Sequence, residues 1–200
     1  MGRIVKKKER KPLIVICSEG GKKSSEYYYF RNFATRDLRI QFSTGNSTDP
    51  EGMLQDLLKY MDNEDVKSED DCKMYFIIDT DLDNSRIQRI KEYEAKCQKY
   101  NIEIITSAPT FEIWYIMHFR NNNLYFNNSS AVKREMSKIL GKDYQESMDL
   151  FKALESKMSF AMETAKAIKE RIIRRNESYI DSNPHTCIPN VIEYINKKLQ

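Results

Sequence analysis

Acidic residues follow two of the most apolar segments of the chain. Glu19 comes shortly after the apolar run 13–17, and Asp79 and Asp81 follow the apolar run 74–78. Two aspartates that are two positions apart at the end of a strand can point to the same side. Carboxylates that lie close together raise one another's pKa values unless a cation offsets their charge, and Mg²⁺ prefers oxygen ligands of this kind. The three acids therefore predict a site for a divalent cation.

The acidic stretch from 79 to 84 also fits ordinary turn chemistry. Asp83 precedes a helix expected to begin at Ser85, so the aspartates can form a turn and an N-cap. Glu19 is harder to explain in this way, because two glycines follow it and let the backbone and a ligand approach each other closely. The sequence leaves open whether Asp83 is a ligand of the cation or the cap of the helix.

Two alternating patterns predict the elements that position these acids. Apolar runs and strict alternation indicate strands, and apolar residues at helical spacing indicate helices. We expect strands at 13–17, 38–42, 74–78 and 102–105, and helices at 24–36, 50–61, 85–100 and 109–119. This order predicts an α/β fold with a mainly parallel sheet that is flanked by helices. In such a sheet ligands bind beyond the carboxyl ends of the strands, where the acids lie.

The pattern changes after residue 120, and no later segment has the pattern of a strand. Helices are expected at 130–140, 145–175 and 189–199. We therefore expect three parts: a basic N-terminal arm at 1–11, an α/β domain at 12–120, and an α-helical C-terminal extension at 121–200 that packs on or beside the domain.

The composition excludes several classes of protein. The 33 Lys and Arg residues nearly balance the 30 Asp and Glu residues, so the net charge of +3 does not by itself indicate a nucleic-acid-binding protein. No apolar run approaches the roughly 18 residues that span a bilayer, so we expect no membrane association and a cytoplasmic location. The four cysteines are widely scattered, which favours neither a zinc site nor a disulfide framework.

Two lysines and two histidines are further candidates. Lys22 and Lys23 follow the glycine pair without the spacing of a P-loop, so they either contact phosphate or lie on a solvated surface. His118 stands in an apolar helix, where a packed and hydrogen-bonded core histidine is expected. His185 stands in a loop, and its role is open.

Several short motifs occur in an order that is similar to a known family. A Glu after the first strand and an Asp-x-Asp after a later one resemble the Toprim fold, the catalytic module of topoisomerases, primases and overcoming-lysogenization-defect nucleases. More specifically, the chain resembles the RloB family over roughly residues 12 to 195, through Glu19-Gly20, Ser25-Glu26 with Tyr29-Phe30, Asp79-Thr80-Asp81, the stretch Ser107-Ala108-Pro109-Thr110-Phe111-Glu112-Ile113-Trp114 through His118-Phe119, and Asn183-Pro184-His185-Thr186. The chain departs from the family pattern in a longer turn before Glu26 and in Thr80, where the family often has a basic residue.

The resemblance implies a metal-dependent nuclease. Such an enzyme hydrolyses phosphodiester bonds of DNA or RNA and acts as the effector of a prokaryotic antiphage or abortive-infection system, beside an AAA/ABC-type ATPase partner and with a homo-oligomer as one option. Mg²⁺ or Mn²⁺ is the implied cofactor. In this interpretation the catalytic residues are Glu19, Asp79 and Asp81. The same three residues hold the metal, with Asp83 and Glu112 as further metal ligands. Glu26 is another site residue, and Lys22 and Lys23 are phosphate contacts.

Other functions stay open at this stage. Glu19 is either a metal ligand or a general base. The whole protein is alternatively a non-catalytic Toprim-like module that binds a partner ATPase or a nucleotide signal. A third interpretation, a phosphohydrolase with Asp79 as nucleophile and Asp81 as acid, leaves Glu19 without a role.

Overall fold

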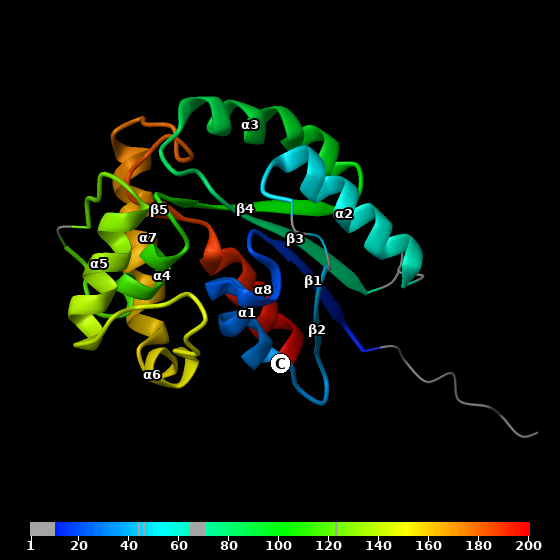
Figure 1. The fold of residues 1–200 in the computed structure, drawn as a ribbon, viewed down its shortest axis with the longest axis horizontal. Coiled ribbons are helices and arrows are strands. Elements are labelled where there is room, and N and C mark those ends of the chain that lie inside the picture. The colour runs from blue at the N-terminus through cyan, green and yellow to red at the C-terminus, as the bar shows by residue number, and fades with distance from the viewer. Residues whose placement is uncertain (1–10, 44, 46, 65–70, 123) are drawn as a thin grey trace, which may run out of the picture.

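The computed structural model describes residues 11–43, 45, 47–64, 71–122 and 124–200. The expected basic arm at 1–11, except for its last residue, lies outside the described residues. The fold is α/β, with helices on both faces of one five-stranded sheet (Figure 1). The strand order is β2-β1-β3-β4-β5, and the strands are β1 (Leu13–Ser18), β2 (Arg39–Phe42), β3 (Cys72–Asp79), β4 (Ile102–Ala108) and β5 (His185–Thr186).

The first four strands are parallel, as the alternation of strand and helix predicts. β1 pairs with both β2 and β3, and β3 pairs with β4. β1 is buried along its whole length, which explains why its residues are continuously apolar rather than alternating. Because β1 and β3 are parallel neighbours, their carboxyl ends meet at the same edge of the sheet, and Ser18 lies opposite Ile77.

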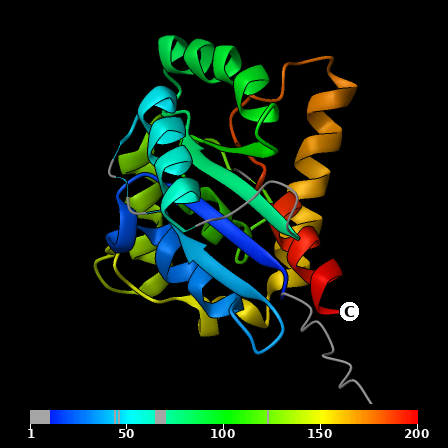
Figure 2. The same cartoon turned by 90° about the vertical axis from the view of Figure 1, so that its right-hand side faces the viewer.

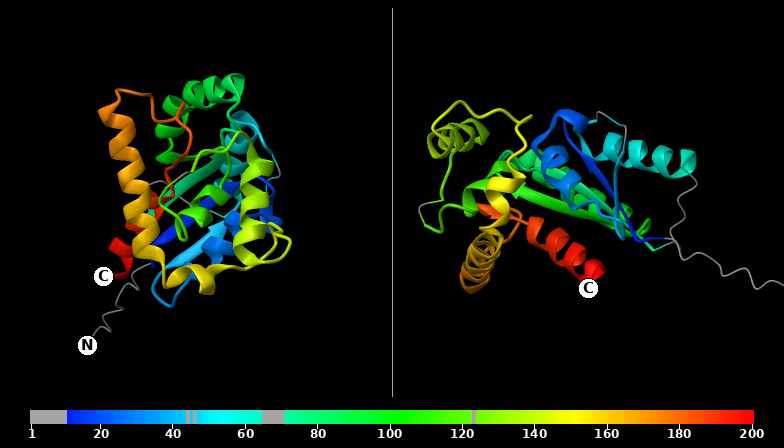
Figure 3. Two further views of the ribbon diagram at one scale, coloured as in Figure 1. Left: turned by 90° about the vertical axis from the view of Figure 1, so that its left-hand side faces the viewer. Right: turned by 90° about the horizontal axis from the view of Figure 1, so that it is seen from below.

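Each face of the sheet has its own apolar cluster. On one face Val15, Met74 and Phe76 pack with α2 (Pro50–Asn63) and α3 (Asn84–Gln98). On the other face Ile16 and Ile77 pack with the helices α1 (Ser25–Phe30), α4 (Glu112–Met117), α5 (Ser129–Leu140), α7 (Met158–Arg174) and α8 (Ile188–Leu199). Figures 2 and 3 show these two helical layers on opposite sides of the strands.

Three expected helices are wrong in extent. The helix expected at 109–119 is α4, which covers only Glu112–Met117, because β4 continues to Ala108. The helix expected at 24–36 consists of α1 and a 3₁₀ turn, Arg31–Phe33, after which the chain extends toward β2. The helix expected at 145–175 consists of α6 (Phe151–Glu155) and α7. The chain before α6 is held in a loop because Asp149 accepts a hydrogen bond from the Phe151 N–H and forms an ion pair with Arg31 at 2.7 Å.

The expectation of no strand after residue 120 is also wrong. β5 pairs antiparallel with β4, with Ser107 opposite Thr186. A strand of two residues carries no periodic pattern, so only its tertiary pairing defines it. Through β5 and through buried side chains such as Val132, Ala161 and Ile192, the helical extension shares an apolar core with the sheet. No helix in the described part of the chain is long and apolar enough to cross a membrane.

Candidate active site

A cavity of about 260 Å³ opens at the carboxyl edge of β1 and β3. Six carboxylates line it, together with hydroxyl groups and one lysine: Glu19, Glu26, Asp79, Asp81, Glu112 and Glu146, with Ser24, Ser25, Thr110, Ser129 and Lys133. The structure therefore brings together the acids that the sequence singles out at two strand ends. It adds Glu26 and Glu112, which the resemblance to the RloB family indicates.

Local backbone geometry positions the acids. Gly20 has a φ of 75°, in the left-handed region that glycine adopts freely, so the chain turns directly after Glu19. The side chain of Ser24 then caps α1 by accepting a hydrogen bond from the Tyr27 N–H at 3.3 Å. After β3, Asp81 and Leu82 have φ values of 50° and 58°, an uncommon conformation that is frequent at functional sites.

Thr110 joins two of the carboxylates. Its hydroxyl oxygen lies 2.7 Å from Asp79 Oδ2 and 2.7 Å from Glu112 Oε2. A hydroxyl group has one proton, so Thr110 donates to one carboxylate at a time and the other requires a proton of its own. Asp79 Oδ1 is buried and has no hydrogen-bond partner among the described residues. A buried oxygen of this kind is an open position for a ligand.

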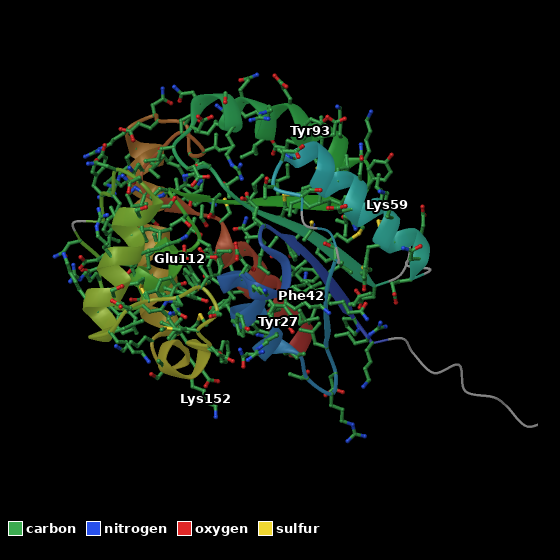
Figure 4. The ribbon with its side chains drawn as sticks, viewed as in Figure 1. Tyr27, Phe42, Lys59, Tyr93, Glu112 and Lys152 are labelled. Atoms are coloured by element: carbon green, nitrogen blue, oxygen red, sulfur yellow. The ribbon has the colours of Figure 1, made fainter. Side chains whose placement is uncertain are left out.

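Glu112 is held from two further elements. Figure 4 shows it on α4, inside the molecule, where only 2% of its surface is exposed. Ser25 Oγ, on α1, donates to Glu112 Oε1 at 2.6 Å, and Tyr144 Oη, from the loop after α5, donates to the same oxygen at 2.9 Å. The helical extension therefore contributes directly to the site.

Arg86 pairs with Glu19 and lies near Asp81, and a serine hydroxyl group also bonds to Asp81. Arg86, in the first turn of α3, forms a close ion pair with Glu19 through Nη2 and donates from Nε to the main-chain oxygen of Asp79 at 2.6 Å. The same Nε lies 3.9 Å from Asp81 Oδ2, and Ser129 Oγ donates to Asp81 Oδ1 at 2.8 Å.

Burial and mutual repulsion raise the pKa values of the central acids. Burial, followed by the charge of Glu112, raises the pKa of Glu26 to about 8. Burial and the charges of Glu26 and Glu112 raise the pKa of Asp79 well above its ordinary value. Burial also raises the pKa of Glu19, although Arg86 opposes the shift. Glu26 therefore holds a proton at neutral pH unless a cation compensates the charge of its carboxylate.

The donor set fits a hard divalent cation in its chemistry. Carboxylate oxygens surround the cavity, and Asp79 Oδ1 lacks a partner. In the described residues, however, no three His, Cys, Asp or Glu side chains already stand together in an arrangement that could hold a metal ion. Binding would therefore require the carboxylates to leave their present partners. The residues that would hold the cation are Asp79, Asp81 and Glu19, with Glu26 and Glu112 beside them.

Asp83 lies outside this cavity and caps α3. Its Oδ1 accepts hydrogen bonds from the Arg86 N–H at 2.7 Å and from Ser85 Oγ at 2.6 Å. The hydrogen bond from Ser85, followed by that from Arg86, lowers the pKa of this fully exposed carboxyl. Of the two interpretations left open by the sequence, this geometry favours the N-cap.

Lys22 and Lys23 are exposed in a 3₁₀ turn, Gly21–Lys23, just before α1. Lys23 lines a second, shallow cavity of about 380 Å³. Lys133 and Glu146 line both this cavity and the carboxylate cavity, so the two are adjacent. Lys23 thus lies at the approach to the acids.

The two histidines are buried away from the carboxylate cavity. His118 Nδ1 lies 2.9 Å from the main-chain oxygen of Trp114, and its ring contacts the Trp114 ring edge to face. His185 lies between Thr106 Oγ1 and the main-chain oxygen of Ser182, both at 2.9 Å. Burial lowers the pKa of both histidines to about 4, so both are neutral at pH 7.

Sequence reasoning missed several polar residues of the site. Ser25 and Thr110 belong to motifs that were quoted for the family resemblance, so those motifs were the available signal. Arg86 follows the acidic strand end, where a basic residue in the first turn of a helix is unfavourable for the dipole and therefore conspicuous. Ser129, Lys133 and Tyr144 come from the helical extension, and no local pattern marks them.

Comparison with family models identifies the family of the chain. The model described as RloB-like protein matches residues 14–195, most of the chain. Comparisons with curated proteins and with solved structures found no significant match. The motif order quoted from the sequence and this match agree over nearly the same range, and the chain therefore belongs to the RloB-like protein family.

Proposed function

We propose that this chain is a Mg²⁺- or Mn²⁺-dependent nuclease that hydrolyses phosphodiester bonds in DNA or RNA. The observation that carries the proposal is the cavity at the carboxyl edge of the sheet, where Asp79 has a buried oxygen without a partner among the described residues and further carboxylates stand beside it. Bringing so many acids together is costly unless a cation belongs there.

A bound divalent cation would orient a substrate phosphate, lower the pKa of a water molecule and offset charge on the leaving oxygen. Asp79 and Asp81 would hold this cation from the end of β3. Glu19 would either complete the ligand set or accept a proton from the attacking water. Ser25 and Tyr144 hold Glu112 in place, which keeps the inner wall of the site polar and fixed.

The approach to the cavity suits a phosphate backbone. Lys23 and Lys133 both line the adjoining shallow cavity, and Lys22 is exposed next to Lys23. Lysines at this position would offset phosphate charge and guide a strand toward the acids. In this account the substrate is a nucleic acid rather than a free nucleotide.

The biological role is part of the same proposal. Membership of the RloB-like family supports a cytoplasmic effector of prokaryotic antiphage or abortive-infection defence that acts with an AAA/ABC-type ATPase, with self-association as one option. A partner that controls the nuclease would also explain why the acids are tied to neighbouring side chains in the isolated chain.

One observation favours a second candidate function. Among the described residues the acids do not converge in a ready-made metal geometry, and Glu19 and Asp81 are already paired. This arrangement also suits a non-catalytic module that binds a partner ATPase or a nucleotide signal. The two candidates differ in whether the cavity supports cleavage.

The test is a cleavage assay with the full-length protein on labelled single-stranded DNA, double-stranded DNA and transfer RNA, in Mg²⁺, in Mn²⁺ and in EDTA. Cleavage is expected only with metal. Asp79→Asn is expected to slow it by about 100-fold or more, on the order of what loss of one charge-stabilising group costs.

Asp83→Asn is the matched control, because Asn preserves the cap of α3 and position 83 lies outside the cavity. This variant is expected to cleave at nearly the wild-type rate. Cleavage that persists in EDTA, or an Asp79→Asn variant as active as wild type, would contradict the proposal.

A further inference from the structure

Arg86 ties together the two strand ends that carry the acids. It stands in the first turn of α3, and only 16% of its side chain is exposed. Its Nε donates to the main-chain oxygen of Asp79 at 2.6 Å, while Nη2 pairs with Glu19 Oε1. One planar guanidinium thus contacts the end of β3 and the residue after β1 at the same time.

Arg86 is also the positively charged side chain that contacts Glu19 and Asp81. Of the ion pairs formed by the described residues, those of Arg86 reach Glu19 and Asp81, and that of Lys133 reaches Glu146. None of these ion pairs reaches the three inner acids, Glu26, Asp79 and Glu112. A single guanidinium therefore supplies the positive charge in contact with Glu19 and Asp81.

A guanidinium and a divalent cation compete for the same carboxylate. Both are attracted to Glu19, and both repel each other strongly over a few ångströms inside a partly buried site. The hydrogen bond from Nε to the Asp79 main chain anchors Arg86 independently of Glu19, so the guanidinium can leave Glu19 without leaving the site. In the structure in which Glu19 is paired with Arg86, no three described His, Cys, Asp or Glu side chains stand in an arrangement that could hold a metal ion.

We propose that Arg86 is a built-in counter-ion of the metal site: it holds Glu19 in the metal-free protein and gives up Glu19 when a divalent cation binds. This inference rests on the proposed metal-dependent function. It makes Arg86 a positioning residue that sets the metal concentration at which the site fills. It also explains how a cluster of acids is kept folded in the absence of metal.

The direct test is a calorimetric titration of Mg²⁺ into the full-length wild type and into Arg86→Gln. Removing the competing charge is expected to tighten Mg²⁺ binding by about tenfold. In EDTA the same variant is expected to melt at a lower temperature than wild type, because the acids lose their counter-ion. Added Mg²⁺ is expected to raise its melting temperature more than that of wild type.

Two control variants distinguish competition between Arg86 and the metal ion for Glu19 from a general effect of net charge. Arg89→Gln removes an exposed arginine from the same helix and is expected to leave the Mg²⁺ affinity within about twofold of wild type. Arg86→Lys keeps the positive charge and is expected to bind Mg²⁺ within about threefold of wild type. If Arg86→Gln does not fold, Arg86→Met repeats the comparison with a second neutral side chain.

A double-mutant cycle isolates the contact with Glu19. In a Glu19→Gln background, Arg86→Gln is expected to change the Mg²⁺ affinity by less than about twofold, because the carboxylate for which the two cations compete has been removed. An equal gain in both backgrounds would show that Arg86 does not act through Glu19, and would overturn the inference.

The failure of this inference is distinguishable from that of the proposed function. If wild type binds Mg²⁺ and cleaves nucleic acid, but Arg86→Gln binds Mg²⁺ equally or more weakly, the counter-ion role is wrong and the nuclease stands. If wild type binds no Mg²⁺ at millimolar concentration, both are wrong.

Discussion

The hydroxyl group of Thr110 has one proton and two carboxylate neighbours, Asp79 and Glu112, each at 2.7 Å. Its position makes it a sensitive probe of the site. Thr110→Val preserves the shape of the side chain but removes the hydroxyl partner of two carboxyl groups. In metal-free protein we expect the free energy of unfolding to fall by about 1–3 kcal/mol, measured by urea denaturation.

Thr164→Val is the matched control. Thr164 is equally buried, but its hydroxyl group bonds only to the Phe160 carbonyl within α7. Loss of this bond leaves no unpaired charge, so the cost is expected to be about 0.5 kcal/mol or less. Equal costs for the two variants would contradict the view that Thr110 bridges two carboxyl groups.

His118 gives a pH-dependent prediction. Burial lowers its pKa in the folded protein to about 4, below the ordinary value of 6.5. The unfolded chain therefore binds a proton at higher pH than the folded chain, and stability is full above pH 6.5 and falls as the pH decreases toward 4. This histidine accounts for a loss of about 3 kcal/mol at most.

The measurement is the free energy of unfolding of wild type and of His118→Phe between pH 7 and pH 4. The Phe variant does not titrate, so its curve is expected to be shallower, whatever its stability at pH 7. His185, whose pKa is also about 4, stays in both proteins and contributes equally. Parallel curves would show that His118 is not buried in its neutral form.

The sequence predicts the acids of this site better than their partners. Glu19, Asp79 and Asp81 were predictable because parallel strands bring their carboxyl ends to one edge, whatever the side-chain details. The pairing of Arg86 with Glu19 spans 67 positions, and that of Tyr144 with Glu112 spans 32. Such contacts depend on side-chain reach in the folded protein, for which the sequence has no local pattern.

At the scale of elements, the residue just before α3, Asp83, has two competing interpretations from the sequence: metal ligand or N-cap. Asp83 caps the helix and lies outside the cavity. Asp83→Ala is expected to lower the free energy of unfolding by about 1 kcal/mol, as loss of an N-cap does, and to leave the Mg²⁺ affinity unchanged. Denaturation and calorimetry measure the two quantities on the same protein.

Asp49→Ala provides the comparison, because Asp49 caps α2 through hydrogen bonds to Glu51 and Gly52 at 3.1 Å. The two variants are expected to lose similar stability. A loss of Mg²⁺ affinity in Asp83→Ala as large as that in Asp79→Asn would instead make Asp83 a ligand.

Element prediction succeeds where burial gives a long, regular pattern. The continuous apolar runs of β1 and β3 and the strong start of α2 at Asp49 and Pro50 were sufficient to place these elements. The loop before α6 was missed because an ion pair from Arg31 to Asp149 holds it, and β5 was missed because its pairing with β4 defines it. In both cases tertiary contacts override local propensity.

At the scale of the molecule, the helical extension and the sheet form one site. Ser129 contacts Asp81, Lys133 lines the cavity, and Tyr144 contacts Glu112. The boundary expected near residue 120 marks a change of sequence pattern, yet the chemistry crosses it. Figure 1 shows α5 beside α4, at the same end of the molecule as the carboxyl ends of the strands.

The central claim is that the carboxylates at the edge of β1 and β3 bind a divalent cation. The most direct test is calorimetric titration of Mg²⁺ and Mn²⁺ into wild type and into a variant that combines Asp79→Asn and Asp81→Asn, with thermal unfolding to show that both are folded. The account predicts that wild type binds metal at millimolar concentration or below and that the variant does not. Absence of binding to wild type, or equal binding to both proteins, would contradict it.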